Sequence, residues 1–304
     1  MIDLRLLAAA AALTFAPMAA LAQAPAAPAT TQAAAFASDR IQITAEGQGR
    51  DVILIPGLSS HPEIWQGLVD RLGPGVRVHR VQVAGFAGLA PGANADGPVS
   101  APVAEEIARY IRERGLQRPA VIGHSMGGSI GIMLAARHPQ AIGRLMVVDM
   151  IPFMGPMFGG PTATSESVRP MADSIRTQML AASPEAFRAQ GAQQVTSMIR
   201  TESLRAGPLR HSATSDHRTS TNAFHELIVT DLRPELARIT APTTVVYAPF
   251  NAPGMTAEMT DGIYRASYRV LPTARLARID DSAHFIMLDQ PDRFQAEVTR
   301  FLAE

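Results

Sequence analysis

The sequence predicts an α/β fold with a mostly parallel central sheet, helices on both faces and a helical cap insertion. Three observations support this prediction. From Ile41 onward, short β-rich runs alternate with helical patterns. Several of these runs are continuously apolar, as is typical of parallel strands buried on both faces. One stretch, at about residues 152–232, has helical patterns but no convincing strand. A chain of 304 residues that is 47% hydrophobic is long enough for one large domain with such an insertion.

The strands and helices follow in order from local composition. The strand runs are rich in Val, Ile, Leu and Thr, and Gly143 and Pro242 mark two strand entries. Strands are expected at residues 41–45, 51–55, 76–83, 120–123, 145–149, 243–247 and 275–279. Core helices are expected at residues 62–71, 103–114, 126–137, 234–238 and 291–302. Within the insertion, helical patterns cover residues 165–181, 184–200 and 221–227.

The first residues are typical of an exported protein. A weakly basic start is followed by an apolar, Ala-rich run and by the small-x-small site Ala20-Leu21-Ala22, which predicts a signal peptide at residues 1–22. Residues 23–39 are rich in Ala, Pro and Thr and are expected to form a disordered linker. The folded domain is expected at residues 40–304. We therefore expect a periplasmic or secreted protein with no stable membrane anchor after cleavage.

Composition excludes several kinds of chemistry. Basic and acidic residues both total 27, and no long basic run is present, so nucleic acid is not an expected partner. The chain has no cysteine, which excludes disulfides, thiolate chemistry and cysteine-ligated zinc. It also lacks an HExxH motif and a phosphate-binding loop, so neither a cofactor nor a metal is expected.

A serine lies where a strand, a sharp turn and a helix meet. Gly123-His124-Ser125-Met126-Gly127 directly follows one apolar run and precedes a helical segment rich in small residues. In a nucleophile elbow the serine has a strained backbone with its hydroxyl exposed, and a Cβ on either flanking glycine would collide with neighbouring backbone. Ser125 is therefore the predicted nucleophile.

A serine nucleophile needs a general base, and His284 lies in a suitable place. It is on the loop between the last predicted strand and the C-terminal helix, and it follows Ser125 in the chain. His124 lies inside the elbow and is expected to point away from the serine. The remaining histidines are expected to be surface or packing residues. His61 is the exception, because it follows the loop that is expected to stabilise the oxyanion.

Two backbone amides are expected to bind the oxyanion of a tetrahedral intermediate. One is the N–H of Met126, the residue after the nucleophile. The other is the N–H of Leu58, which follows the flexible Gly57 on the loop after the second predicted strand. The same segment is also compatible with a plain strand-to-helix connection that Ser59 or Ser60 caps.

From about residue 41 onward, the chain resembles the α/β-hydrolase superfamily, in the branch with a helical cap over the active site. The matching pieces are Ile55-Pro56-Gly57-Leu58, the elbow and Ser282-Ala283-His284-Phe285. The resemblance implies a cofactor-free serine hydrolase. The chain departs from the family in having Pro56 where a histidine is usual, and Asn251 near the usual position of the acid.

The acid that orients His284 has more than one candidate. Asp149 ends the strand that follows the nucleophile, and some members of the superfamily resemble this arrangement. Asp261, Asn251 and the pair Asp280 and Asp281 are alternatives. An amide in place of the acid is expected to cost several orders of magnitude in rate, so a carboxylate is expected rather than Asn251. We select Asp149 because of its position at the end of that strand.

The expected reaction is hydrolysis of carboxylic esters through an acyl-enzyme at Ser125, with His284 as general base. The cap and its entry carry many soft apolar side chains that suit a small to medium hydrophobic substrate: Met150, Phe153, Met154, Met157, Phe158, Met171, Met179 and Met198. Alternatives on the same scaffold are a carbon–carbon bond hydrolase, a lactonase, an acyltransferase or a non-catalytic binding protein.

Overall fold

The computed structural model describes residues 36–304, so the predicted signal peptide and the linker as far as residue 35 lie outside the described residues. Phe36 packs edge-on against Tyr110 with the ring centroids 5.1 Å apart, and the Arg109 guanidinium lies over the Phe36 ring. Phe36, four residues before the predicted start of the domain, therefore already packs against the core. In residues 36–304 no helix is long and apolar enough to cross a membrane.

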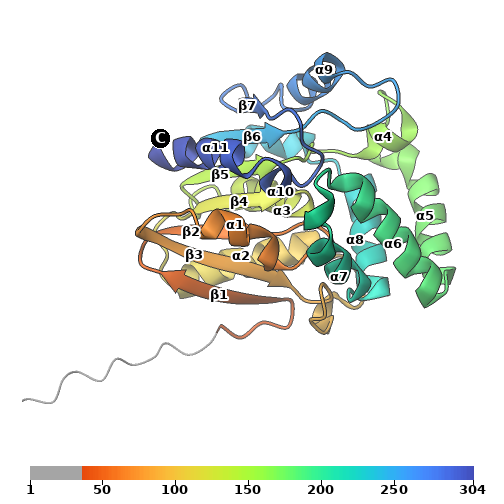
Figure 1. Cartoon of the computed structure of the whole chain (residues 1–304), viewed down its shortest axis with the longest axis horizontal. Helices are drawn as coiled ribbons and strands as arrows, with labels where there is room; N and C mark the ends of the chain where they lie inside the picture. Colours follow the sequence, from red (N-terminus) through yellow and green to blue (C-terminus); the bar gives the residue numbers. More distant parts are fainter. Residues whose placement is uncertain (1–35) are drawn as a thin grey trace, which may run out of the picture. The chain divides into compact units, whose positions relative to one another are not determined.

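The central sheet has seven strands in the order β1-β3-β2-β4-β5-β6-β7 (Figure 1). Only β1 runs antiparallel to its neighbour, β3, and the other pairs are parallel. All seven predicted strands are confirmed, with ends that differ by two residues at most. The bounds are β1 Ile41–Gly47, β2 Gly49–Ile55, β3 Gly75–Val83, β4 Ala120–His124, β5 Arg144–Val148, β6 Thr243–Tyr247 and β7 Arg275–Arg278.

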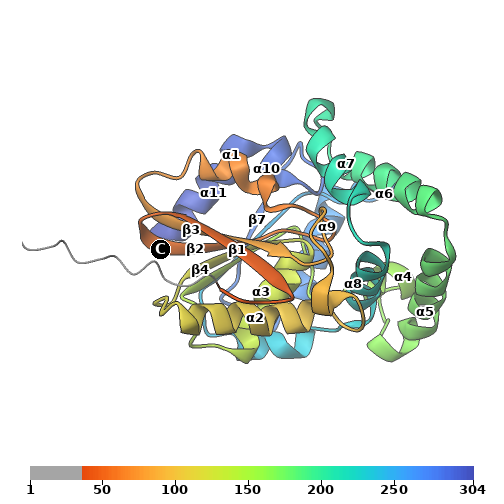
Figure 2. The ribbon, with the colours of Figure 1, turned by 90° about the horizontal axis from the view of Figure 1, so that it is seen from below.

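Helices cover both faces of the sheet, as the apolar strands require (Figure 2). One face packs against α2 (Ser100–Glu113) and α3 (Met126–Arg137), and the other against α1 (Gln66–Val69) and α11 (Pro291–Ala303). Every residue of β4 and β6 is buried, and α3 is buried along nearly its whole length. The predicted nucleophile elbow therefore lies between two closely packed elements of the core, β4 and α3.

The insertion forms a cap of helices at one side of the core (Figures 1 and 2). Its helices are α4 Gly155–Gly159, α5 Ser165–Ala181, α6 Pro184–Met198, α7 Ala206–Ala213 and α8 His217–Val229. A small cluster of buried apolar residues, including Val168 and Ile228, holds α5 against α8. No residue of α6 is buried. The predicted helical patterns are confirmed, but α8 begins four residues earlier than expected, and α4 and α7 were not predicted.

The remaining elements are short or were missed. The predicted helix at residues 62–71 divides into a 3-10 turn, η1 (Pro62–Trp65), and α1. Helix α9 (Ala257–Ser267) was not predicted, because it contains Gly262 and buries only Thr260 and Tyr264. The others are η2 Gly92–Asn94, η3 Glu202–Leu204, η4 Arg233–Arg238 and α10 Ile286–Asp289.

Candidate active site

Ser125 lies at the sharp turn between β4 and α3. Its backbone has φ 53° and ψ −122°, a left-handed conformation that non-glycine residues seldom adopt. A Cβ on Gly123 would lie 2.1 Å from the carbonyl oxygen of Gly127, and a Cβ on Gly127 would lie 2.3 Å from that of Ile55. Both glycines are needed, because no larger residue leaves room for this turn.

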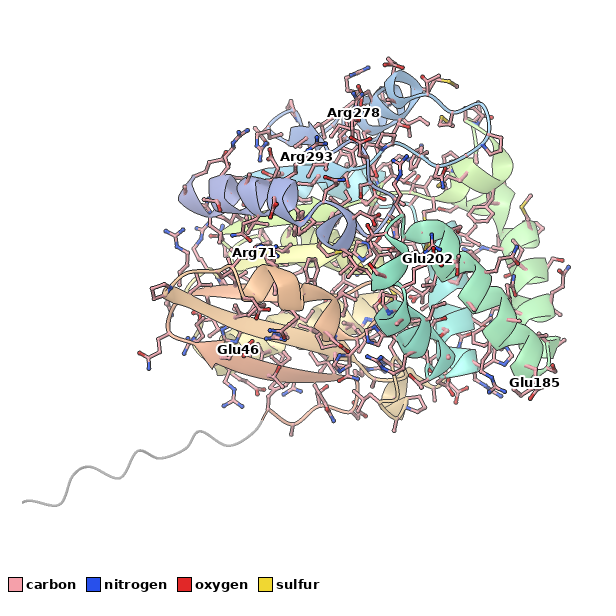
Figure 3. The ribbon with its side chains drawn as sticks, in the orientation of Figure 1. Glu46, Arg71, Glu185, Glu202, Arg278 and Arg293 are labelled. Carbon is pink, nitrogen blue, oxygen red and sulfur yellow. The ribbon has the colours of Figure 1, made fainter. Side chains whose placement is uncertain are left out.

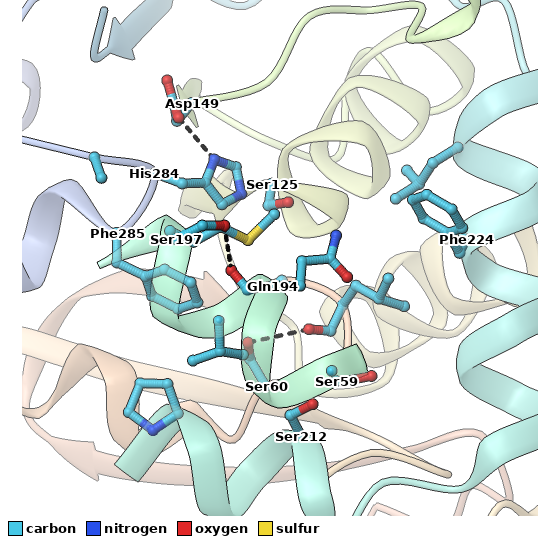
Figure 4. A pocket seen from close by; sticks show the side chains of 18 of the residues that line it. Ser59, Ser60, Ser125, Asp149, Gln194, Ser197, Ser212, Phe224, His284 and Phe285 are labelled. Carbon is cyan, nitrogen blue, oxygen red and sulfur yellow. Dashed lines mark hydrogen bonds and ion pairs between the residues drawn. The ribbon is translucent and has the colours of Figure 1, made fainter. Parts of the chain in front are cut away.

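His284 and Asp149 lie 135 residues apart in the sequence and meet beside Ser125 (Figure 4). The Nδ1 atom of His284 lies 2.7 Å from Oδ2 of Asp149, whose side chain is almost fully buried. A carboxylate only accepts hydrogen bonds, so the imidazole Nδ1 carries the proton and donates. The other ring nitrogen, Nε2, is left free to accept a proton from the neighbouring Ser125 hydroxyl.

The second oxygen of Asp149 has its own donors. Oδ1 accepts hydrogen bonds from the Ala248 amide at 3.0 Å and from the Tyr264 hydroxyl at 3.1 Å. Tyr264 is 1% exposed, and burial raises its pKa well above 10, so it stays protonated and donates. Sequence reasoning missed both donors. No motif marks them, because Tyr264 belongs to the unpredicted helix α9.

The other candidate acids have different partners. Asp261 accepts hydrogen bonds from the Tyr247 hydroxyl at 2.8 Å and from Arg278 at 2.7 Å. Arg278 is the last residue of β7 and contacts Asp261 of α9 (Figure 3). Asp261 therefore belongs to a surface ion pair. Asn251 lines the active-site cavity, but the Nδ1 atom of His284 forms its hydrogen bond with Asp149.

The two predicted oxyanion amides lie on either side of the serine. Met126 is the first residue of α3, so its N–H has no carbonyl acceptor within the helix. Leu58 follows Gly57, on which a Cβ would lie only 3.1 Å from the Cβ of Ser125. Ser59 has φ 53°, a left-handed turn that shapes this loop. The loop therefore passes next to Ser125, which is the position that the predicted second oxyanion amide requires.

His124 has a structural role that the sequence did not reveal. It is 1% exposed, and burial lowers its pKa well below 6.5, so the ring is neutral. Its Nε2 atom lies 3.0 Å from the backbone carbonyl of His284 and donates to it. The elbow and the His284 loop are thereby joined directly.

Ser125, His284 and Asp149 open onto a cavity of about 680 Å³ between core and cap. Five of the soft apolar residues noted in the sequence line it: Met150, Met154, Met157, Met179 and Met198. Phe153 and Phe158 instead pack within the cap. Among residues 36–304, no Lys, Arg or Glu lines the cavity. The site therefore suits an uncharged, largely apolar ligand.

Comparisons with known proteins agree with this geometry. The alpha/beta hydrolase family profile matches residues 52–297. A putative carbamate hydrolase RutD of Serratia proteamaculans is 29% identical over 63% of this chain and 70% of its own length. A pimeloyl-[acyl-carrier protein] methyl ester esterase of Nitrosomonas europaea is 24% identical over 84% of this chain and 96% of its own length.

Solved structures share the fold as well. The crystal structure of a hydrolase from Pseudomonas aeruginosa PA01 superposes with a TM-score of 0.70 and 20% identity, covering 87% of this chain and 94% of that one. This likeness extends over the sheet, its helices and the inserted helical segment. The chain belongs to the alpha/beta hydrolase family and is a hydrolase of that family.

Proposed function

We propose that the protein is a serine hydrolase that cleaves carboxylic esters of small to medium hydrophobic substrates. The observation that carries this proposal is the 2.7 Å hydrogen bond between His284 and the buried Asp149, beside Ser125 at the base of an apolar cavity. A buried carboxylate that fixes one imidazole tautomer beside a strained serine matches the requirements of acyl transfer.

In the proposed reaction, the Ser125 hydroxyl oxygen attacks the acyl carbon while its proton moves to Nε2 of His284. The amides of Leu58 and Met126 stabilise the oxyanion. When the tetrahedral intermediate collapses, the C–O bond to the alcohol breaks, and His284 returns the proton to the leaving alkoxide. Water then attacks the acyl-enzyme by the same route, which releases the acid and restores the serine.

The cavity supports the proposed substrate class. Its volume of about 680 Å³ is within the usual range for small-molecule sites. Methionines on the cap can repack around differently shaped apolar groups. Because no Lys or Arg lines the cavity, a neutral ester is favoured over a carboxylate-bearing one.

The direct test is labelling by a fluorophosphonate, combined with turnover of p-nitrophenyl esters of increasing acyl length. We expect wild-type protein to be labelled and Ser125→Ala protein to be unlabelled and inactive. Activity should rise with acyl length and fall once the acyl chain exceeds the cavity. A wild-type protein that is neither labelled nor active on any ester would overturn the proposal.

Carbamate cleavage is a second candidate. One cap helix, α6, carries Gln190, Gln193 and Gln194 at the cavity, and their neutral amides can hydrogen-bond to a carbamate nitrogen. The relative from Serratia proteamaculans is named as a putative carbamate hydrolase. Matched ester and carbamate substrates with the same leaving group separate the two candidates by their kcat/KM ratio.

We also propose, from the sequence of residues 1–22, that the protein is exported. Mass spectrometry of the protein recovered from its native host should show a chain beginning near Gln23 in the periplasmic or extracellular fraction. Recovery of the full-length chain from the cytoplasmic fraction alone would contradict export.

A further inference from the structure

Two histidines and a glutamate form a cluster outside the cavity, where the core meets the cap. His61 caps η1, Glu63 lies within η1, and His211 belongs to the cap helix α7. Oε2 of Glu63 lies 3.1 Å from Nε2 of His211 and 3.9 Å from Nδ1 of His61. One potential ligand atom from each residue can be chosen so that all three lie within 4.8 Å of one another.

This donor set matches the preferences of zinc. Zinc is held by imidazole nitrogens and carboxylate oxygens at about 2.0–2.2 Å, so tetrahedral ligand atoms are roughly 3.3 Å apart. The 3.1 Å separation is near this value and the 3.9 Å separation is longer. Nδ1 of His61 also accepts a hydrogen bond from the Glu63 amide at 3.1 Å, which a metal bound at that atom would replace. His211 is fixed, with 4% exposure, whereas the side chains of Glu63 and His61 are 52% and 36% exposed and can adjust.

We propose that His61, Glu63 and His211 form a binding site for a divalent transition metal, with zinc as the best fit, that joins the cap helix α7 to the loop after β2. Two imidazoles and one carboxylate favour zinc over calcium or magnesium, which prefer oxygen ligands. Solvent reaches the exposed Glu63, so water supplies the fourth ligand.

The position of the site links it to the cavity. His61 lies three residues after Leu58, which lines the cavity and is the predicted second oxyanion donor, and Pro208 and Ser212 of α7 line the cavity on both sides of His211 in the sequence. A metal at this site holds the cap against the oxyanion loop. The earlier expectation that the protein has no metal site rested on sequence motifs, which do not detect ligands 148 residues apart.

Arg210 provides a specific test of metal binding at Glu63. Its Nη2 atom lies 3.0 Å from the same Glu63 oxygen that the metal requires, and its side chain is 58% exposed. The guanidinium therefore competes with the metal for the carboxylate, and it repels a cation. Removing it should strengthen metal binding, whereas removing a ligand should weaken binding.

The experiment uses the untagged full chain after treatment with EDTA. Zinc binding is measured by calorimetry and by the shift in Tm, and Co²⁺ substitution is followed by its visible absorption. We expect one saturable site per chain and a higher Tm with metal. His61→Ala and Glu63→Gln, both at partly exposed side chains, should weaken binding by about tenfold or more. Arg210→Ala should strengthen it.

The matched control is His138→Ala. His138 is also paired with a glutamate, Glu105, at 2.9 Å, but it has no second histidine partner among the residues that the structure describes. This control should bind metal as the wild type does. The proposal is overturned if zinc does not bind, if His61→Ala and Glu63→Gln bind as tightly as wild type, or if Arg210→Ala weakens binding. Because each measurement reports binding, the result is independent of the proposed esterase activity.

Discussion

At the scale of single residues, Asp149 is the most constrained side chain of the site. Its carboxylate accepts hydrogen bonds from His284, Ala248 and Tyr264, and its backbone has φ 50°, in the left-handed region. Such a conformation costs about 1–3 kcal/mol and persists where surrounding contacts fix it. The strain and the three donors together direct Oδ2 toward His284.

Asp149→Asn should lower kcat for esters by about four orders of magnitude, because the amide favours the wrong imidazole tautomer. Asp261→Asn is the matched control. It removes a carboxylate held by Tyr247 and Arg278, and we expect activity within a few-fold of wild type. Steady-state kinetics on one chromogenic ester decides between them. Full activity in Asp149→Asn together with loss in Asp261→Asn would show that the acid has been misassigned.

Tyr264→Phe should reduce kcat roughly tenfold with little change in KM. The substitution removes one of two donors to Oδ1 of Asp149, and a hydrogen bond to a charged group is worth about 1.5–3 kcal/mol. The Ala248 amide remains and limits the loss. A purely structural role would instead lower Tm and leave kcat per folded molecule unchanged. Kinetics and thermal unfolding are therefore measured on the same sample.

The parts of the site that are set by local sequence could be predicted. The elbow around Ser125 and the Gly57-Leu58 loop each depend on a few consecutive residues, and the structure places them side by side. The acid could not be chosen with the same certainty. Asp149 directly follows β5, whereas Asp261 lies in the segment after β6, and only the hydrogen bonds in the structure show which of them contacts His284.

At the scale of elements, strands were easier to predict than cap helices. Buried strands such as β4 and β6 are short apolar runs, whereas α7 and α9 bury few residues. These two helices supply His211 to the proposed metal site and Tyr264 to Asp149. Both contacts were therefore beyond reach of the sequence.

Helix α6 should exchange its amide hydrogens faster than α5. It buries no residue, whereas α5 buries Val168 and Ala172 in the cap cluster. Local opening costs least where few apolar contacts are lost. Hydrogen exchange followed by mass spectrometry would test this, with the fully packed α3 as the slow reference. Equal protection of α5 and α6 would contradict it.

At the scale of the whole molecule, stability should fall as the pH drops below about 6.5. Burial lowers the pKa of His124 well below its value of about 6.5 in an unfolded chain. Below about pH 6.5, His124 binds a proton in the unfolded state but stays neutral in the folded state. The free energy of unfolding therefore decreases as the pH is lowered, by at most about 1.4 kcal/mol per pH unit for each proton. Burial shifts the pKa of His79 in the same direction.

Urea unfolding between pH 7.5 and 5.5 measures this dependence, and His124→Gln should reduce its slope by up to one proton. Glutamine retains an N–H donor for the His284 carbonyl, so the comparison isolates titration. An identical slope in wild type and variant would show that His124 does not contribute.

The absence of buried residues in α6 also affects how the protein can evolve. Substitutions along this helix should cost little folding free energy, yet Gln190, Gln193 and Gln194 line the cavity. The core side of the cavity, by contrast, adjoins β4, β5 and α3, where substitutions cost more folding free energy. Substrate preference can therefore diverge through substitutions in α6 alone, while Ser125, His284 and Asp149 stay the same.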